Sequence, residues 1–233
     1  MNDNITTIDS MGYGSSVDER NKVLRNTYWL LSLSMVPTIL GAWIGVATGV
    51  GAAMATMSPW ISLIVFMGGA FGFMFAIEKF KNSAAGVPIL LAFTFFMGLM
   101  LSRLIGNILG LSNGASLIMT AFAGTGGIFL GMATLSTVIK RDLSSMGKFL
   151  FIGMVMVLVA AVANIFFQSP ALMIALSVLV IGISSAFILY DLKRVKDGEE
   201  TNYITATLSV YLSLYNIFSN LLALLGIFGG ERD

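Results

Sequence analysis

The chain has 233 residues, of which 57% are hydrophobic and only 11% are charged. A soluble domain carries about 25% charged residues, so this composition excludes a water-facing globular fold and indicates a membrane protein. The net charge of +1 excludes a strong electrostatic attraction for nucleic acid. The lack of cysteine and histidine excludes disulfides, thiolate nucleophiles, Cys/His zinc sites and histidine acid–base chemistry.

The first 26 residues are polar and show no apolar period. This composition predicts a flexible N-terminal tail over residues 1–26, followed by a transmembrane domain over residues 27–233. No apolar core lies near the start, so a cleavable signal peptide is not expected.

Seven apolar runs follow the tail, and most are long enough to cross a hydrocarbon core, which takes about 20 residues. The sequence therefore predicts an all-α integral membrane protein with seven transmembrane helices. Pro59 and Pro170 are expected at helix starts, where a missing N–H costs little, and Pro37 is expected to kink the first span. The predicted spans cover residues 28–48, 60–77, 84–108, 115–139, 147–167, 171–190 and 204–228.

The basic residues predict the orientation of the spans. Eleven of the thirteen lysines and arginines lie in the tail or in alternate loops on one side. The positive-inside rule then predicts a cytoplasmic N-terminus, and seven spans place the C-terminus in the periplasm. The eleven are Arg20, Lys22, Arg25, Lys79, Lys81, Lys140, Arg141, Lys148, Lys193, Arg194 and Lys196.

Small residues recur at helix-contact spacing on two of the spans. One ladder consists of Gly41, Gly45 and Gly49. Packing within one chain is the commoner role of such ladders, and an oligomer interface is the alternative. The second ladder comprises Thr120, Gly124, Gly127, Gly131 and Thr134.

Two ionisable residues lie at the ends of predicted spans. Asp191 shares a helical face with Ser177 and Ser184, because the three are spaced by seven residues. Carboxylates at such positions are costly and often functional, since burial disfavours the charged form; the alternative is a cytoplasmic-end aspartate paired with Lys193 or Arg194. Arg103 is expected to reach the head groups, with a gating salt bridge as the alternative.

The last span carries a polar stripe down one helical face. Its members are candidates either for hydrogen bonds between helices or for the lining of a wet path. If the stripe faces the sixth span, Ser213 and Asn216 join Ser184 in one polar seam. The stripe consists of Thr205, Ser209, Ser213, Asn216 and Asn220.

Several enzyme and pigment classes are excluded by missing residues. The last span has no lysine for a retinal Schiff base, and no histidine is available for a rhomboid-like protease. An intramembrane aspartyl protease needs two facing aspartates, and only Asp191 qualifies. No phosphate-binding or dinucleotide-binding glycine pattern follows a strand. We therefore expect a protein that is not an enzyme, with no catalytic residues, no cofactor and no metal site.

Three long segments carry a resemblance to a known family: NKVLRNTYWLLSLSMVPTI, VANIFFQSPALMIALSVLVIGISSAFILYD and GEETNYITATLSVYLSLYNIFSNLLALLG. They resemble the bacterial YccA-type branch of the Bax inhibitor (transmembrane Bax inhibitor motif) family. The likeness runs from about residue 21 to the end. It implies six helices that surround a central, largely buried seventh helix.

The resemblance implies two functions. Relatives of the YccA type associate with FtsH, a membrane-anchored ATP-dependent protease, and modulate its action in membrane-protein quality control in the bacterial inner membrane. In that reading the tail, with Asp18, Glu19 and Arg20, is the expected partner-binding segment. Other relatives are pH-sensitive calcium leak channels that use two aspartates; Asp191 matches the first, but Ser213 stands at the second. A path for calcium or protons along the sixth and seventh spans is therefore the alternative.

Overall fold

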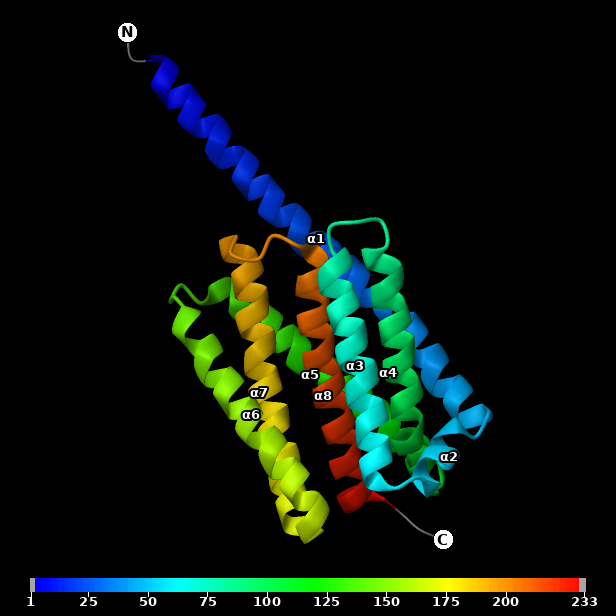
Figure 1. Cartoon of the computed structure of the whole chain (residues 1–233). Coiled ribbons are helices and arrows are strands. Elements are labelled where there is room, and N and C mark those ends of the chain that lie inside the picture. Colours follow the sequence, from blue (N-terminus) through cyan, green and yellow to red (C-terminus); the bar gives the residue numbers. More distant parts are fainter. Residues whose placement is uncertain (1–2, 231–233) are drawn as a thin grey trace.

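Seven long helices and one short helix make up the computed structural model, which describes residues 3–230 (Figure 1). All seven long helices are long and apolar enough to cross a membrane, and no strand occurs between residues 3 and 230. The all-helical, multi-pass fold expected from the composition is therefore confirmed. The helices are α1 (Asp3–Ala47), α2 (Val50–Thr56), α3 (Pro59–Phe80), α4 (Gly86–Leu109), α5 (Gly114–Val138), α6 (Ser144–Phe167), α7 (Pro170–Asp197) and α8 (Tyr203–Gly229).

Helix α1 differs from the expectation for the N-terminal segment. It begins at Asp3 and continues through Pro37 to Ala47, so residues 3–26 are helical rather than irregular. Extending an existing helix costs less than starting a new one, and no proline precedes Pro37 to stop it. The first half of α1 projects beyond the bundle (Figure 1). Flexibility of this segment stays a prediction.

Helices α1 and α4 pack with their backbones in close contact. A Cβ added to Gly41 would overlap the carbonyl oxygen of Phe95, and one added to Gly98 would overlap that of Thr38. A Cβ added to Gly45 would instead overlap the side chain of Ser102. Gly41 and Gly45 of the first glycine ladder therefore pack within the chain, as predicted, because small residues let helix backbones approach.

Three other glycines of the two ladders do not pack in this way. Gly49 adopts a φ of +74° and precedes the short helix α2, which the sequence analysis did not predict. On α5, added Cβ atoms on Gly127 and Gly131 would meet open space. The prediction of packing within the chain is therefore wrong for these three residues.

The core is built around α4 and α8. Helix α8 packs against α1, α3, α4, α5 and α7, whereas α6 packs mainly against α7. In the most apolar 18-residue stretch of each helix, 28% of the residues are buried in α8 and 39% in α4. Helix α8 is thus no more enclosed than α4, and a central helix surrounded by six others stays a prediction. Large apolar side chains such as Trp29, Phe75 and Phe149 are exposed on the outside, where lipid would cover them.

Candidate functional site

Helices α7 and α8 form a hairpin that is tied to the rest of the bundle. Gly198 ends α7 with a φ of +84°, and its N–H bonds the carbonyl groups of Arg194 and Val195. Asn202 begins α8, where its Oδ1 accepts from the N–H groups of Ile204 (2.9 Å) and Thr205 (3.2 Å). Its Nδ2 donates to Asn82 Oδ1 (2.8 Å) in the α3–α4 loop. A helix cap and a bond between loops thus set the position of α8.

The three residues that were predicted to share one face of α7 are all buried. Ser177, Ser184 and Asp191 are 5%, 0% and 9% exposed. The hydroxyl of Ser184 has no hydrogen-bond partner in the described part of the chain. The structure likewise gives the Asp191 carboxylate no hydrogen bond within residues 3–230. Buried polar groups are normally paired, so this face is the most unusual polar feature of the bundle.

The charged neighbours of Asp191 on its own helix have other partners. Lys193 Nζ donates to Asp197 Oδ1 (2.6 Å), and Arg194 Nε lies 3.5 Å from Glu199 Oε2. The expected alternative, an ion pair of Asp191 with Lys193 or Arg194, is therefore not found. Arg194 still attracts the Asp191 carboxylate electrostatically, and Glu200 repels it.

The polar stripe of α8 does not bond to other helices. Ser213 is buried, whereas Thr205, Ser209, Asn216 and Asn220 are half-buried. The Thr205 hydroxyl has no partner among the described residues. The Asn220 amide donates to the Asn216 carbonyl of the same helix (2.8 Å). No side chain of the stripe forms a bond between helices in the described part of the chain.

The bonds that α8 does make to other helices come from a neighbouring face. The hydroxyls of Tyr211 and Thr38 share a 2.8 Å hydrogen bond, and Tyr211 also reaches the Thr94 carbonyl (3.4 Å). Thr207 reaches the Thr27 carbonyl (3.4 Å). Sequence reasoning missed these residues. The spacing of four between Thr207 and Tyr211, and the usual need of a buried tyrosine hydroxyl for a partner, are the signals that could have found them.

The distance of each predicted site residue from the α7–α8 loop follows from the rise per residue of a helix. Asp191 lies six residues before the end of α7, and Ser209 lies six residues after the start of α8. At about 1.5 Å per residue, both are about 9 Å from the hairpin loop. Ser184 and Asn216 are both about 20 Å from it, and Ser213 lies between the two levels at about 15 Å. The α7 face and the α8 stripe therefore overlap in their distance from the hairpin loop.

The predicted partner-binding residues lie where α1 leaves the bundle. Asp18, Glu19 and Arg20 are all exposed. The Arg20 side chain nevertheless lies against Gly198, whose added Cβ would come within 2.7 Å of Arg20 Nε. Arg20 therefore rests on the α7–α8 hairpin, and Asp18 and Glu19 precede it on α1.

Asn202, the N-cap of α8, and Asn216, within α8, are expected to differ in their effect on stability. Asn202→Ala removes the helix cap and the bond to Asn82, so we expect a loss of about 1–2 kcal/mol of unfolding free energy. Asn216→Leu removes no bond between helices, so we expect a change below about 0.5 kcal/mol. Thermal unfolding in detergent measures both variants. Equal destabilisation by the two substitutions would contradict this arrangement.

Known proteins resemble this chain over nearly its whole length. A family model described as inhibitor of apoptosis-promoting Bax1 matches residues 20–230. The Escherichia coli K12 protein named "Modulator of FtsH protease YccA" is 39% identical over 94% of this chain and 95% of its own length. An uncharacterized membrane protein of Vibrio cholerae is 38% identical over 90% of this chain and 91% of its own. An uncharacterized protein of Neisseria meningitidis is 36% identical over 96% of this chain and 98% of its own. The chain belongs to the Bax inhibitor family of membrane proteins.

Proposed function

We propose that the chain is a non-enzymatic protein of the bacterial inner membrane that binds the FtsH protease and modulates its action in membrane-protein quality control. The observation that carries this proposal is the 39% identity, over 94% of the chain, to the E. coli modulator of FtsH. A second E. coli relative with the same coverage is named an inner membrane protein.

The same proposal includes an orientation. The N-terminus of α1 lies at one end of the bundle, together with the α3–α4, α5–α6 and α7–α8 loops (Figure 1). Eleven of the thirteen basic residues belong to α1 or to the regions of these loops, so the positive-inside rule supports a cytoplasmic location for this end. The C-terminus is then periplasmic.

The projecting part of α1 is the proposed point of contact with FtsH. The first half of α1 extends beyond the bundle (Figure 1), and most of the stability of a helix in a protein comes from tertiary packing rather than from propensity. Such a segment unfolds at little cost, so an ATP-driven protease can grip it. Asp18 and Glu19 add exposed charge at its base.

Deletion of residues 2–19 tests this contact and leaves Arg20 on Gly198. We expect the truncated protein to fold and to retain about tenfold less FtsH in a pull-down from detergent-solubilised membranes, because a few contact residues carry most of the affinity of an interface. The matched control is the full-length Asp18→Asn/Glu19→Gln variant. It removes the two charges but keeps the extended segment, so it shows which of the two FtsH binding requires. Undiminished FtsH binding by the truncated protein would remove the N-terminal segment from the account.

One observation favours a second candidate function, a proton or cation leak along α7 and α8. Asp191 and Ser184 are buried on one face of α7 and make no hydrogen bond within residues 3–230. Such groups can line a wet path. Ser213 stands where channel-type relatives carry a second aspartate, so two carboxylates cannot share a proton here. No group of three acidic side chains that could hold a metal ion occurs among the described residues, and calcium prefers several oxygen ligands.

A further inference from the structure

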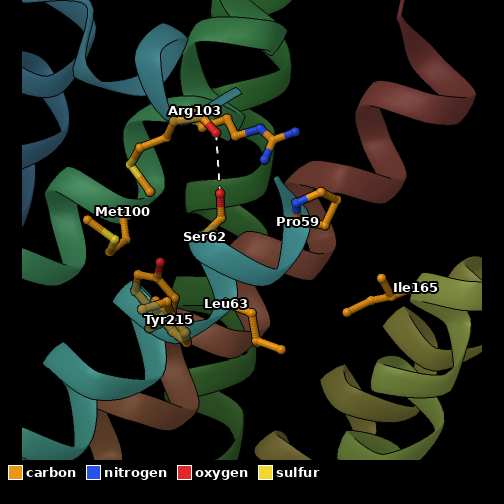
Figure 2. Close-up of a pocket in the computed structure, with 9 residues that line it drawn as sticks. Pro59, Ser62, Leu63, Met100, Arg103, Ile165 and Tyr215 are labelled. Carbon is orange, nitrogen blue, oxygen red and sulfur yellow. Dashed lines mark hydrogen bonds between the residues drawn. The ribbon is translucent and has the colours of Figure 1, made fainter. Parts of the chain in front are cut away.

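A pocket with one cationic side chain opens at the end of the bundle opposite the N-terminus. It has a volume of about 330 Å³, within the range of about 300–1,000 Å³ that is usual for small-molecule sites. We call it the Arg103 pocket. Most of its lining is apolar (Figure 2). The lining residues are Met54, Pro59, Ser62, Leu63, Phe66, Met100, Arg103, Ile165 and Tyr215.

The pocket lies where two groups of helices meet. Helix α3 packs against α4 and α8, and α6 packs mainly against α7. The rings of Trp60 on α3 and Phe166 on α6 are in contact, with centroids 5.2 Å apart. Next to this contact, Pro59 and Ile165 face the pocket from the two sides (Figure 2). The pocket is therefore placed between spans, where a lipid molecule can reach it from the bilayer.

Arg103 is the cation of this pocket, and it has no counterion among the described residues. It lies six residues before the end of α4 and is exposed, and no carboxylate within residues 3–230 forms a salt bridge with its guanidinium. In Figure 2 the guanidinium extends toward Pro59, at the first turn of α3. An arginine at this depth binds phosphate oxygens well, because its planar donors match their geometry.

The first turn of α3 adds to the positive potential at the same place. Ser58 precedes Pro59 but provides no capping side-chain bond. The first N–H groups of a helix carry partial positive charge and attract anions. Of this turn, Pro59 has no N–H and the Ser62 N–H donates to the Ser58 carbonyl (3.1 Å). The N–H groups left for an anion are therefore those of Trp60 and Ile61, beside the lining residues. The hydroxyl of Ser62 is already used, since it donates to the Met54 carbonyl (3.3 Å).

The other end of the pocket is apolar apart from one hydroxyl. Leu63, Met100 and Tyr215 of α8 lie away from the guanidinium (Figure 2), and Phe66 also lines the pocket. A site with a cation at one end and a wall of aliphatic and aromatic side chains at the other matches an amphiphile with an anionic head. We propose that the Arg103 pocket binds one anionic phospholipid of the bilayer, with its phosphate at Arg103 and the start of α3 and part of an acyl chain along the wall.

Lipid retention measured by native mass spectrometry tests this proposal. The purified full-length protein is titrated in detergent with phosphatidylglycerol or with phosphatidylcholine. We expect the protein to retain phosphatidylglycerol more strongly, and Arg103→Gln to weaken this retention about tenfold, the usual effect of losing one charge-assisted bond. Arg103→Lys should restore part of it, because the charge returns without the planar donors.

Two controls make the result decisive. Lys148→Gln removes an exposed cation from α6 near the opposite end of the bundle and should leave retention unchanged. Soluble glycerol phosphate should not displace the lipid at matched concentration, since it lacks the acyl chain. Equal retention of the two lipids, unchanged retention in Arg103→Gln, equal loss in Lys148→Gln or displacement by glycerol phosphate would each overturn the proposal.

Discussion

Gly98→Ala is expected to lower the unfolding free energy by about 3 kcal/mol or to prevent folding, the upper range for overpacked sites. The added methyl group would overlap the carbonyl oxygen of Thr38, a backbone atom that cannot rotate away. Helices α1 and α4 would have to separate, and Thr38 would move with α1. Thermal unfolding in detergent and gel filtration measure the loss.

Gly106→Ala is the matched control for this variant. It makes the same change on the same helix, but the added Cβ would meet open space. Because alanine is a better helix former than glycine by about 1 kcal/mol, we expect unchanged or slightly raised stability. Similar melting temperatures for the two variants would contradict the close contact of α1 and α4.

Tyr211→Ala is expected to cost about 3 kcal/mol, as for other buried aromatic side chains replaced by alanine. Tyr211 is 1% exposed, bonds to Thr38 and lies with its ring 6.1 Å from that of Phe93. Its loss leaves a cavity where α1, α4 and α8 meet, because these side chains come from the three helices. The measurement is again thermal unfolding in detergent.

Tyr211→Phe separates the hydroxyl from the ring. It keeps the volume and removes only the bonds to Thr38 and Thr94, so we expect a loss of about 0.6–1.2 kcal/mol, at the average of about 0.6 kcal/mol for each bond between membrane helices. An effect as large as that of Tyr211→Ala would mean that the hydrogen bonds, rather than the packing of the ring, hold α8 in place.

The sequence predicted the spans well because helix boundaries are marked by local chemistry. Pro59 and Pro170 begin α3 and α7 as expected. The short helix α2 was missed because its seven residues are too few to show a period. The helical start of α1 was missed because its polar composition favours a loop, whereas the structure extends a helix already formed in the bundle.

The side-chain partners of the candidate site were harder to predict. On a helix that is apolar nearly all round, hydrophobic periodicity does not show which face contacts protein and which contacts lipid. The stripe from Thr205 to Asn220 was therefore a reasonable candidate, yet Thr207 and Tyr211 make the bonds to other helices. The face of Ser177, Ser184 and Asp191 was predicted correctly as a unit, because three polar residues at a spacing of seven share a side of any helix.

The most direct test of the proposed function is proteolysis by FtsH in liposomes that contain or lack this protein, with ion flux followed in the same vesicles. The account predicts that the rate of degradation of a membrane-protein substrate changes when the protein is present, and that neither protons nor calcium leak. An unchanged rate of degradation, together with a flux that Asp191→Asn abolishes, would contradict it and establish the leak along α7 and α8 instead.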